Sequence, residues 1–544
     1  MSKFRKLMAA GVVTLAGAAL AACGNNSSSS SAGGGKKTLN WMDKTEIEGM
    51  DVAKVTDATS FTQLNNTMEG LYRLGKNSKV ENALATKTTT SKDGKIWTFT
   101  LRKDDKWSNG DPVTAKDFVY SWRRTVTPST GSQYSYLFSG IENADAIVAG
   151  KKKPNTLGVK AVGDDKLVVT LDKRIPYFKL LMGFPLFFPQ SQKAVEQYGK
   201  SYGTSSKITV YNGPFVQKGW TGSNLSWKLV KNKNYWDKKN VKLNTINYSV
   251  QKTPSTDYNL YQSGKLDAAL LGPQASKELK NQKGYTLRKT ASTIYLEMNQ
   301  KKAPFNNENF RKALSLAINR KELANSVGGA AEPADTLSPE NMTEVKGKDY
   351  TNLVRGTATK KFNTYNKKQA QAYWKKAQKE LGKKSVSFSI LTYDDDASKK
   401  GGEFLQSSIE SALKGVNVRV QSIPKKTALD HAGSGDYDVF LMGWTADFSD
   451  PISFLDLNTS KNSQNWEKYS DSTYDKLVAE SKVTPSETTR WNDLVKAEQR
   501  IISTQGVTPL YHPEEAWMVR STVKGVVYNG AGAPYNFKEA YIAN

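Results

Sequence analysis

Cysteine and histidine are almost absent from this chain of 544 residues, which contains one cysteine and two histidines. A single thiol, Cys23, excludes an intrachain disulfide and a thiolate zinc site. His431 and His512 lie far apart in the sequence and are expected to be surface or packing residues. We therefore expect no metal site and no cofactor.

Catalytic motifs are also missing. The sequence has neither H-E-x-x-H nor the phosphate-binding pattern G-x-x-x-x-G-K-[ST]. Residues 199–203, GKSYG, match the nucleophile elbow G-x-S-x-G, but that elbow follows a buried strand, whereas residues 193–198 have a polar, helical character. No pair of carboxylates stands out either. The absence of an identifiable nucleophile favours a binding protein over an enzyme.

The N-terminus carries a targeting signal. A basic start, MSKFRK, precedes an uncharged stretch, and residues 20–23 (LAAC) form a small-residue cleavage site. LAAC resembles the bacterial lipobox, whose cysteine receives a diacylglyceryl group and becomes the first mature residue. An ordinary signal peptide that ends near a cysteine is the alternative. We predict a lipoprotein signal at residues 1–23, lipidation at Cys23, and a Ser/Gly-rich tether at residues 24–35.

A lipid anchor and tether would hold the protein at the extracytoplasmic face of the cell membrane. No later segment offers about 18 consecutive apolar residues, so no further membrane span is expected. The formal net charge is +26, and loss of residues 1–23, which contain three basic and no acidic residues, leaves +23. This charge attracts cell-wall polyanions or anionic lipid, or it is a solubilising lysine-rich surface.

Nucleic acid is a poor candidate partner because the lysines are scattered along the chain and no nucleic-acid module is recognisable. A lysine-rich lipoprotein on a short tether suggests a Gram-positive cell.

Length and hydrophobic periodicity predict a mixed α/β chain of two or three domains. Apolar runs and period-two alternation predict strands at residues 96–101, 167–171 and 386–390. Helical periodicity and stop signals predict helices at residues 115–124, 309–326, 366–381 and 403–413. Between residues 388 and 444 strands alternate with helices, with further strands at residues 416–420 and 437–442, which is typical of a parallel α/β sheet.

Several segments together resemble one family. They are SKDGKIWTFTLRKDDKWSNGDPVTAKDFVYSWRRTVTP at 91–128, YNGPF at 211–215, KNKNYWD at 231–237, APFNNENFRKALSLAINR at 303–320 and GWTADFSDP at 443–451. In this order, over the whole mature chain, they resemble the oligopeptide-binding (OppA-type) extracytoplasmic solute-binding lipoproteins of peptide ABC transporters.

The resemblance implies a two-lobed, periplasmic-binding-protein-like α/β fold of the class with an additional inserted domain, and a hinge between the lobes that closes on the ligand. Carried onto this chain, the first lobe combines residues 36–68, 192–293 and 514–544. The inserted domain would be residues 69–191, and the second lobe residues 294–513. The strand and helix alternation at residues 388–444 falls within that second lobe.

The resemblance also implies binding residues. In the family, the acid after Trp-x-Ala binds the α-amino group of the peptide, and that position is Asp447. Without the family, an aspartate before a turn is more often a cap or a solvated loop residue. Trp444 would line a side-chain pocket or pack in the core, and Thr445 and Ala446 lie between it and the acid.

A second implied segment, residues 55–59 (VTDAT), aligns with the part of the family that pairs with the peptide main chain, as in strand addition. Its central residues are Thr56, Asp57 and Ala58. Valine, threonine and alanine suit an extended chain, and a plain loop is the alternative. Tyr134 or Tyr136 is expected to reach the peptide backbone.

Three positions depart from the family pattern. Some members hold the peptide carboxylate with an arginine three residues before the tryptophan, where this chain has Leu441. A family tryptophan aligns with Lys425, and a histidine used for longer ligands aligns with Ser398. These departures imply that the receptor accepts peptides of various lengths or binds the peptide C-terminus in a different way. Lys425 either binds the peptide carboxylate in place of the arginine or is a surface lysine.

The sequence thus predicts a monomeric receptor that binds oligopeptides between two lobes and delivers them to the membrane permease of an ABC importer. A receptor specialised for a signalling or murein peptide is the first alternative. A surface adhesin that uses the +23 charge is the second, and an enzyme is the third.

Overall fold

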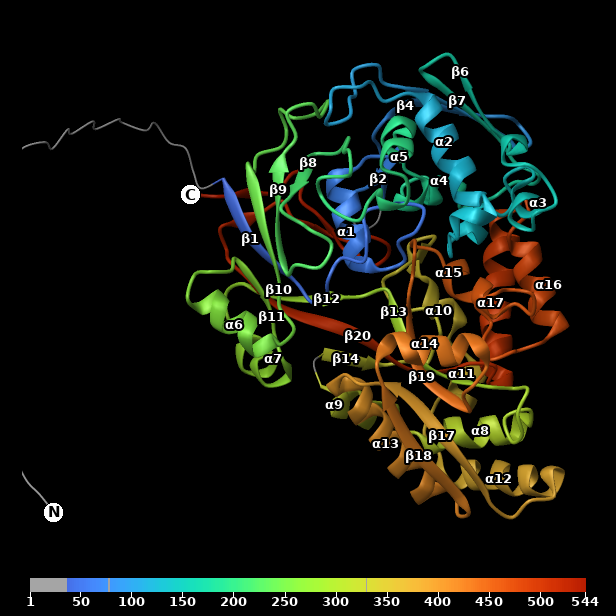
Figure 1. Cartoon of the computed structure of the whole chain (residues 1–544). Coiled ribbons are helices and arrows are strands. Elements are labelled where there is room, and N and C mark those ends of the chain that lie inside the picture. Colours follow the sequence, from blue (N-terminus) through green and yellow to red (C-terminus); the bar gives the residue numbers. More distant parts are fainter. Residues whose placement is uncertain (1–36, 77–78, 329) are drawn as a thin grey trace, which may run out of the picture. The chain divides into compact units, whose positions relative to one another are not determined.

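Three larger β-sheets organise the residues that the computed structural model describes, which are 37–76, 79–328 and 330–544 (Figure 1). The predicted signal with Cys23 and the predicted tether at residues 24–35 lie outside the described residues. Within the described ranges, no helix is both long enough and apolar enough to cross a bilayer.

The first sheet has the strand order β1-β10-β9-β8. Its strands are β1 (Thr38–Asp43), β10 (Thr245–Val250), β9 (Ser226–Lys231) and β8 (Phe215–Lys218). β1 pairs in parallel with β10, and the other pairs are antiparallel. Alternate side chains of β10 are buried, as expected for a sheet with one covered face. Helix α1 (Ala58–Thr67) contacts β8, and residues 59–67 are all buried.

The second sheet is antiparallel and lies wholly within the predicted inserted domain. Its order is β4 (Ala85–Thr90), β5 (Ile96–Leu101), β7 (Lys166–Thr170) and β6 (Val159–Val162). Helix α2 (Ala115–Val126) packs against β6 and β7 and begins with a capping box between Thr114 and Asp117. The strands predicted at 96–101 and 167–171 and the helix predicted at 115–124 are confirmed.

The third sheet has eight strands in the order β11-β20-β13-β19-β17-β18, with β12 and β14 also paired to β20. Its strands are β11 (Ala268–Leu270), β12 (Tyr285–Lys289), β13 (Ser292–Met298), β14 (Ala330–Pro333), β17 (Val386–Tyr393), β18 (Val416–Ile423), β19 (Val439–Thr445) and β20 (Thr508–Val519). β17 is parallel to β18 and β19, which confirms the predicted alternation. β13 is antiparallel to both neighbours, so the sheet as a whole is mixed.

Strand β20 changes partners along its length. Its first half pairs with β13 and β14, and its second half pairs with β11 and β12. The lobe boundaries predicted at 293/294 and 513/514 fall inside β13 and β20. The predicted boundaries therefore lie within two neighbouring strands.

Helices cover both faces of the β17-β18-β19 part of the sheet. One face buries side chains such as Ile390 and Leu441 against Leu405 of α13. The other buries Leu391 and Phe440 with Ala428 of α14. The main helices of this region are α8 (Glu308–Ala317), α9 (Arg320–Val327), α12 (Lys367–Leu381), α13 (Asp396–Ala412), α14 (Lys425–Ser434), α16 (Ser472–Ser481) and α17 (Glu487–Thr504).

Two helix predictions need correction. The helix predicted at 309–326 is two helices, α8 and α9, because Ile318 is extended and the Asn319 side chain accepts from the backbone N–H of Glu322, which caps a new helix. The helix predicted at 403–413 begins at Asp396. Gly402 lies inside it because a Cβ there would approach Val420 to 2.9 Å. The helix predicted at 366–381 is confirmed, with Asn366 as its N-cap.

The remaining elements are short. They are β2 (Tyr72–Leu74), β3 (Val80–Asn82), α3 (Ala144–Val148), α4 (Phe178–Leu181), α5 (Gln192–Tyr198), α6 (Pro254–Gln262), α7 (Pro273–Leu279), β15 (Glu344–Val345), β16 (Lys348–Asp349), α10 (Tyr350–Val354), α11 (Thr357–Phe362), α15 (Ile452–Leu455), β21 (Val523–Lys524), β22 (Val527–Tyr528), β23 (Tyr535–Asn536) and β24 (Tyr541–Ile542).

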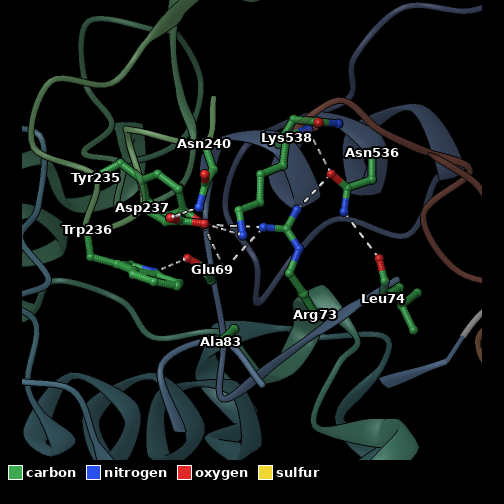
Figure 2. Close-up of polar contacts among 12 residues, drawn as sticks. Glu69, Arg73, Leu74, Ala83, Tyr235, Trp236, Asp237, Asn240, Asn536 and Lys538 are labelled. Atoms are coloured by element: carbon green, nitrogen blue, oxygen red, sulfur yellow. Dashed lines mark hydrogen bonds and ion pairs between the residues drawn. The ribbon is translucent and has the colours of Figure 1, made fainter. Parts of the chain in front are cut away.

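A buried polar cluster joins the start of the predicted inserted domain to the first lobe (Figure 2). Glu69, which is 1% exposed, accepts hydrogen bonds from Arg73 (3.2 Å) and from the Tyr235 hydroxyl (3.1 Å). Its second oxygen accepts from the indole N–H of Trp236 at 2.8 Å. The buried carboxylate therefore has a cation and two further donors, which compensates for its lost hydration.

The same cluster reaches the C-terminal segment. Arg73 donates to the Asn536 side chain at 2.7 Å, and Asn536 donates to the Leu74 carbonyl at 3.2 Å. Lys538 forms an ion pair with Asp237 at 2.6 Å. Residues from three distant parts of the sequence are thus held together by one network (Figure 2).

Replacing Glu69 with alanine should lower the free energy of unfolding by about 3–5 kcal/mol, because Arg73 would stay buried without its carboxylate. The matched control is Glu308→Ala, which removes an exposed carboxylate paired with Lys312 and should cost at most about 0.5 kcal/mol. Urea unfolding followed by tryptophan fluorescence measures both. Equal midpoints for the two variants would show that the cluster does not stabilise the fold.

Candidate ligand-binding site

Asp447 lies two residues beyond the end of β19 and is 6% exposed. Its Oδ1 accepts a hydrogen bond from the Tyr134 hydroxyl at 3.1 Å, and its backbone N–H donates to the Ser453 hydroxyl at 2.9 Å. Among the described residues, no basic side chain forms an ion pair with it. A buried carboxylate without a cation is costly unless a ligand supplies one.

Burial raises the pKa of Asp447 from 3.8 to about 7, and the hydrogen bond from Tyr134 partly opposes this shift. Burial also raises the pKa of Tyr134 well above its usual value, and the neighbouring Asp447 carboxylate adds to this effect. The tyrosine therefore keeps its proton and remains a donor. A ligand cation would favour the ionised carboxylate.

The loop that carries Asp447 is fixed by backbone hydrogen bonds at the junction of the lobes. The Ala446 N–H donates to the Ala291 carbonyl at 2.8 Å, and the Gly532 N–H donates to the Ala446 carbonyl at 2.8 Å. The Ala291 N–H in turn donates to the Gly530 carbonyl at 3.0 Å. Gly532 has a φ of +70°, and a Cβ there would lie 2.9 Å from the Asp447 carbonyl oxygen. The loop of Asp447 is therefore bonded to the segment between β12 and β13 and to the segment between β22 and β23.

Of the two tyrosines considered from the sequence, Tyr134 contacts Asp447 directly. Tyr136 stacks on Tyr134, with ring centroids 5.8 Å apart. Tyr136 and Asp447 line a small cavity of about 40 Å³, whose other walls include Tyr177 and Phe448, themselves stacked at 5.5 Å. The hydrogen bond between Tyr134 and Asp447 brings a residue of the predicted inserted domain against the predicted second lobe.

Thr56 and Asp57 precede α1, and Asp57 is extended (φ −109°, ψ 150°). Ala58, which the resemblance placed in the extended segment, is instead the first residue of α1, because Asp57 caps the helix directly before it. Asp57 caps α1, because its Oδ1 accepts from the Ser60 N–H at 2.8 Å, while its buried Oδ2 has no partner among the described residues. No backbone hydrogen bond joins Thr56 to another described residue. The segment thus combines a helix cap with an unpaired extended edge.

Trp444 and Thr445 lie at the end of β19, opposite the start of β13. Trp444 is half-buried, and its indole N–H is buried without a partner in the described part of the chain. Thr445 is exposed, with its hydroxyl 2.7 Å from that of Ser292, and Ala446 is buried. Trp444 therefore has an unused donor near Asp447.

Each of the three residues that depart from the family pattern has a defined place in the fold. Leu441 is 2% exposed and packs on the α13 face, so a side chain there points away from the Phe440 face. The Ser398 hydroxyl donates a hydrogen bond at 2.6 Å to the side chain of Asp395, the N-cap residue of α13. Lys425 begins α14 and is exposed. Burial raises the pKa of Asp57 and of Glu48, and the charge of Lys425 partly opposes both shifts.

Sequence reasoning missed a group of charged residues near Asp57. Burial raises the pKa of Asp43 to about 7, opposed by Lys44, and the nearby Asp57 raises it further. Lys44 forms an ion pair with Glu515, 471 residues later in the sequence. No local motif marks these residues. They are far apart in the sequence, and only the fold brings them together.

Catalytic and metal chemistry find little support in the described ranges. No group of three or more histidine, cysteine or acidic residues there could hold a metal ion. His512 is buried beside Thr293, and burial lowers its pKa to about 4. His431 lies 3.0 Å from Asp436 at the surface. Residues 199–201 form a 3-10 turn directly after α5, so a helix stands where a nucleophile elbow requires a strand.

Residues 79–466 match the sequence profile of the bacterial extracellular solute-binding proteins, family 5. The chain is 36% identical over 525 residues to a dipeptide-binding protein of Lactococcus lactis subsp. cremoris, covering 93% of this chain and 94% of that protein. It also resembles the solved structure of Listeria monocytogenes OppA bound to peptide, with 38% identity, a TM-score of 0.84, and coverage of 94% of this chain and 100% of that one.

A third relative indicates how the lobes are arranged. The structure of the Escherichia coli murein tripeptide binding protein MppA gives a TM-score of 0.82 at 27% identity, covering 94% of this chain and 99% of that chain. Its unliganded open form gives 0.70 at 28% identity, covering 94% and 98%. This chain therefore superposes better on the first of these two structures than on the unliganded open form. The fold is the two-lobed α/β fold with an inserted domain that the sequence predicts.

Replacing Asp447 with asparagine should stabilise the ligand-free protein at pH 8. The carboxyl has a pKa of about 7 in the folded protein and an ordinary value of 3.8. Between these values the unfolded chain releases a proton that the folded protein keeps, so stability falls as pH rises. Asparagine avoids this loss, and the free energy of unfolding should rise by about 2–4 kcal/mol at pH 8 and be unchanged below pH 4.

Thermal melting from pH 4 to pH 8, after removal of any retained ligand by unfolding and refolding, measures this effect. Asp51→Asn is the control, because Asp51 is equally buried but pairs with Arg124 at 2.7 Å, so its loss should destabilise the protein at pH 8. A lower melting temperature for Asp447→Asn at pH 8 would mean that Asp447 already has a stabilising partner.

Proposed function

The chain belongs to the bacterial extracellular solute-binding proteins of family 5, and on that basis we propose that it is an extracytoplasmic receptor for oligopeptides. It binds them in the cleft between two lobes and delivers them to an ABC importer, and it carries out no chemistry. The observation that carries this proposal is Asp447, a buried carboxylate that pairs with no cation in the described part of the chain and lies where the predicted lobes meet.

Asp447 would bind the α-ammonium group of the peptide. An ammonium ion within hydrogen-bonding distance supplies the missing cation, and the bond is charge-assisted on both sides. The Tyr134 hydroxyl, 3.1 Å from the carboxylate, adds a polar group at the same point. Every peptide with a free N-terminus carries this ammonium, so the contact gives affinity without sequence preference.

Main-chain pairing would hold the rest of the peptide. The backbone groups of Thr56 have no partner among the described residues and the next residue, Asp57, is extended, which suits strand addition. Trp444, with its unpaired indole N–H, would wall a side-chain pocket. Leu441 lies in an apolar core, so no fixed cation captures the peptide carboxylate at that position, which supports permissive peptide length.

Binding couples to lobe closure because the two groups around the ammonium belong to different parts of the fold. Tyr134 comes from the predicted inserted domain and Asp447 from the predicted second lobe. A ligand that contacts both favours the arrangement in which they meet. The closed receptor would then be the form that the permease recognises.

The N-terminal segment would anchor the receptor. A lipidated Cys23 and the tether at residues 24–35 would keep a monomeric receptor at the extracytoplasmic face of the membrane, near the permease, and the lysine-rich surface fits a Gram-positive envelope. Membership of an extracellular solute-binding family supports this location.

Asp447→Ala should weaken the binding of a peptide with a free N-terminus by roughly 30- to 4,000-fold, which corresponds to about 2–5 kcal/mol for the loss of one partner of a buried charge pair. N-acetylation of the peptide should have a similar effect, and the two changes together should not add. Calorimetry with matched free and acetylated peptides measures this. Thr445→Ala, which removes an exposed hydroxyl near the site, should change affinity by less than tenfold. Equal binding of acetylated peptides would rule out the amine clamp.

Cys23→Ser should release the protein from the cells that produce it. The hydroxyl cannot take the place of the thiol that accepts the lipid, so we expect the variant in the medium and the wild type in the membrane fraction. Cell fractionation and mass measurement of the mature N-terminus distinguish lipidation from an ordinary signal peptide, which would release both proteins alike.

A further inference from the structure

A groove of about 740 Å³ runs along helix α2, apart from the cavity beside Asp447, and we call it the α2 groove. Its floor is the polar side of the helix, where Lys116, Tyr120 and Arg123 follow one another at helical spacing. The opposite side of α2 buries Phe118 and Trp122. Lys160 and Ala161 of edge strand β6 and Gln192 at the start of α5 also line it. Both elements pack against α2 (Figure 1).

The lining of the α2 groove is basic. Four basic side chains and no acidic one line it: Lys116, Arg123, Arg124 and Lys160. The carboxylates that border it are already engaged. Asp51 pairs with Arg124 at 2.7 Å, Asp164 pairs with Lys116 at 2.8 Å, and Glu196 accepts from Gln192 at 2.7 Å.

Arg123 and Lys160 carry charge that no carboxylate neutralises in the described part of the chain. Arg123 donates to the carbonyls of Asn155 (3.2 Å) and Val159 (3.5 Å), which orient its guanidinium without cancelling its charge. Lys160 is exposed on β6. Three consecutive exposed lysines, residues 151–153, end two residues before Asn155 and extend the positive surface.

The chemistry of these groups points to phosphate. A guanidinium matches the geometry of phosphate oxygens, and lysine adds a point charge. The basic residues of α2 are distributed over two turns, roughly 12 Å along the helix axis, which suits a ligand with repeated charges. Tyr120 offers an aromatic ring between them.

We propose that the α2 groove binds a linear phosphodiester polymer of the cell envelope. An extracellular family and a net charge of +26 place a basic groove among anionic envelope polymers, and the attraction does not depend on the peptide site. Such binding would concentrate the receptor in the wall layer while its cleft stays free for peptides.

The test measures binding of the full-length mature protein to fluorescently labelled poly(glycerol phosphate) at physiological ionic strength. Arg123→Gln with Lys160→Gln should weaken binding about 30-fold, or about 1 kcal/mol for each lost cation near an anionic surface. Lys368→Gln with Lys375→Gln, on the exposed side of α12, removes the same charge and should change binding less than twofold. Peptide affinity should be unchanged in both double variants, which also shows that they fold.

Lys160→Arg keeps the charge at an exposed position and should retain binding, whereas Lys160→Glu should weaken it even though no packing is lost. Equal losses in the two double variants would overturn the proposal in favour of diffuse surface charge. Binding to vesicles containing phosphatidylglycerol, without binding to the soluble polymer, would overturn it in favour of a lipid headgroup. Absence of polymer binding by the wild type would also overturn it.

Discussion

Three backbone hydrogen bonds determine the position of Asp447, the proposed ligand-binding carboxylate. They link Ala446 to Ala291 and to Gly532, and Ala291 to Gly530, so the end of β19, the crossing between β12 and β13, and the C-terminal hairpin meet at one point. Because these bonds use main-chain atoms, they depend on the path of the chain more than on side-chain identity. Their consequence is that Asp447 is buried where the end of β19 meets the C-terminal hairpin and Tyr134 of the predicted inserted domain.

Two buried carboxylates of this protein, Glu69 and Asp447, differ in how many partners they have. Glu69 has a cation and two neutral donors, and its burial ties segments together. Asp447 has one hydroxyl donor and no cation among the described residues, and its pKa rises to about 7 as a result. Burial with a full set of partners contributes to the fold, whereas burial without a cation lowers stability and is common at functional sites. The desolvation of Glu69 is compensated within the protein, and that of Asp447 would be compensated by the proposed ligand ammonium.

The sequence predicts local structure well where one signal acts alone. Period-two alternation marks β5, and the capping box with its apolar face marks α2. It fails where a cap or a tertiary contact overrides periodicity. Asn319 caps a new helix and so divides a continuous helical pattern. Gly402 lies inside a helix that packs close to the sheet, although glycine is typical of helix ends. Periodicity cannot tell Tyr134 from Tyr136, since only the packing of the inserted domain against the loop of Asp447 selects one.

The path of the first lobe has a consequence for biosynthesis. Arg73 contacts Asn536, 463 residues later, and the strands β11 and β12 pair only with the C-terminal half of β20. These two strands cannot take their places in the sheet until residues 514–519 have been made. Contacts of such long sequence separation form slowly. A chain of an extracellular family crosses a membrane on its way to its site, and strands that wait for a distant partner leave the polypeptide more time in an extended form.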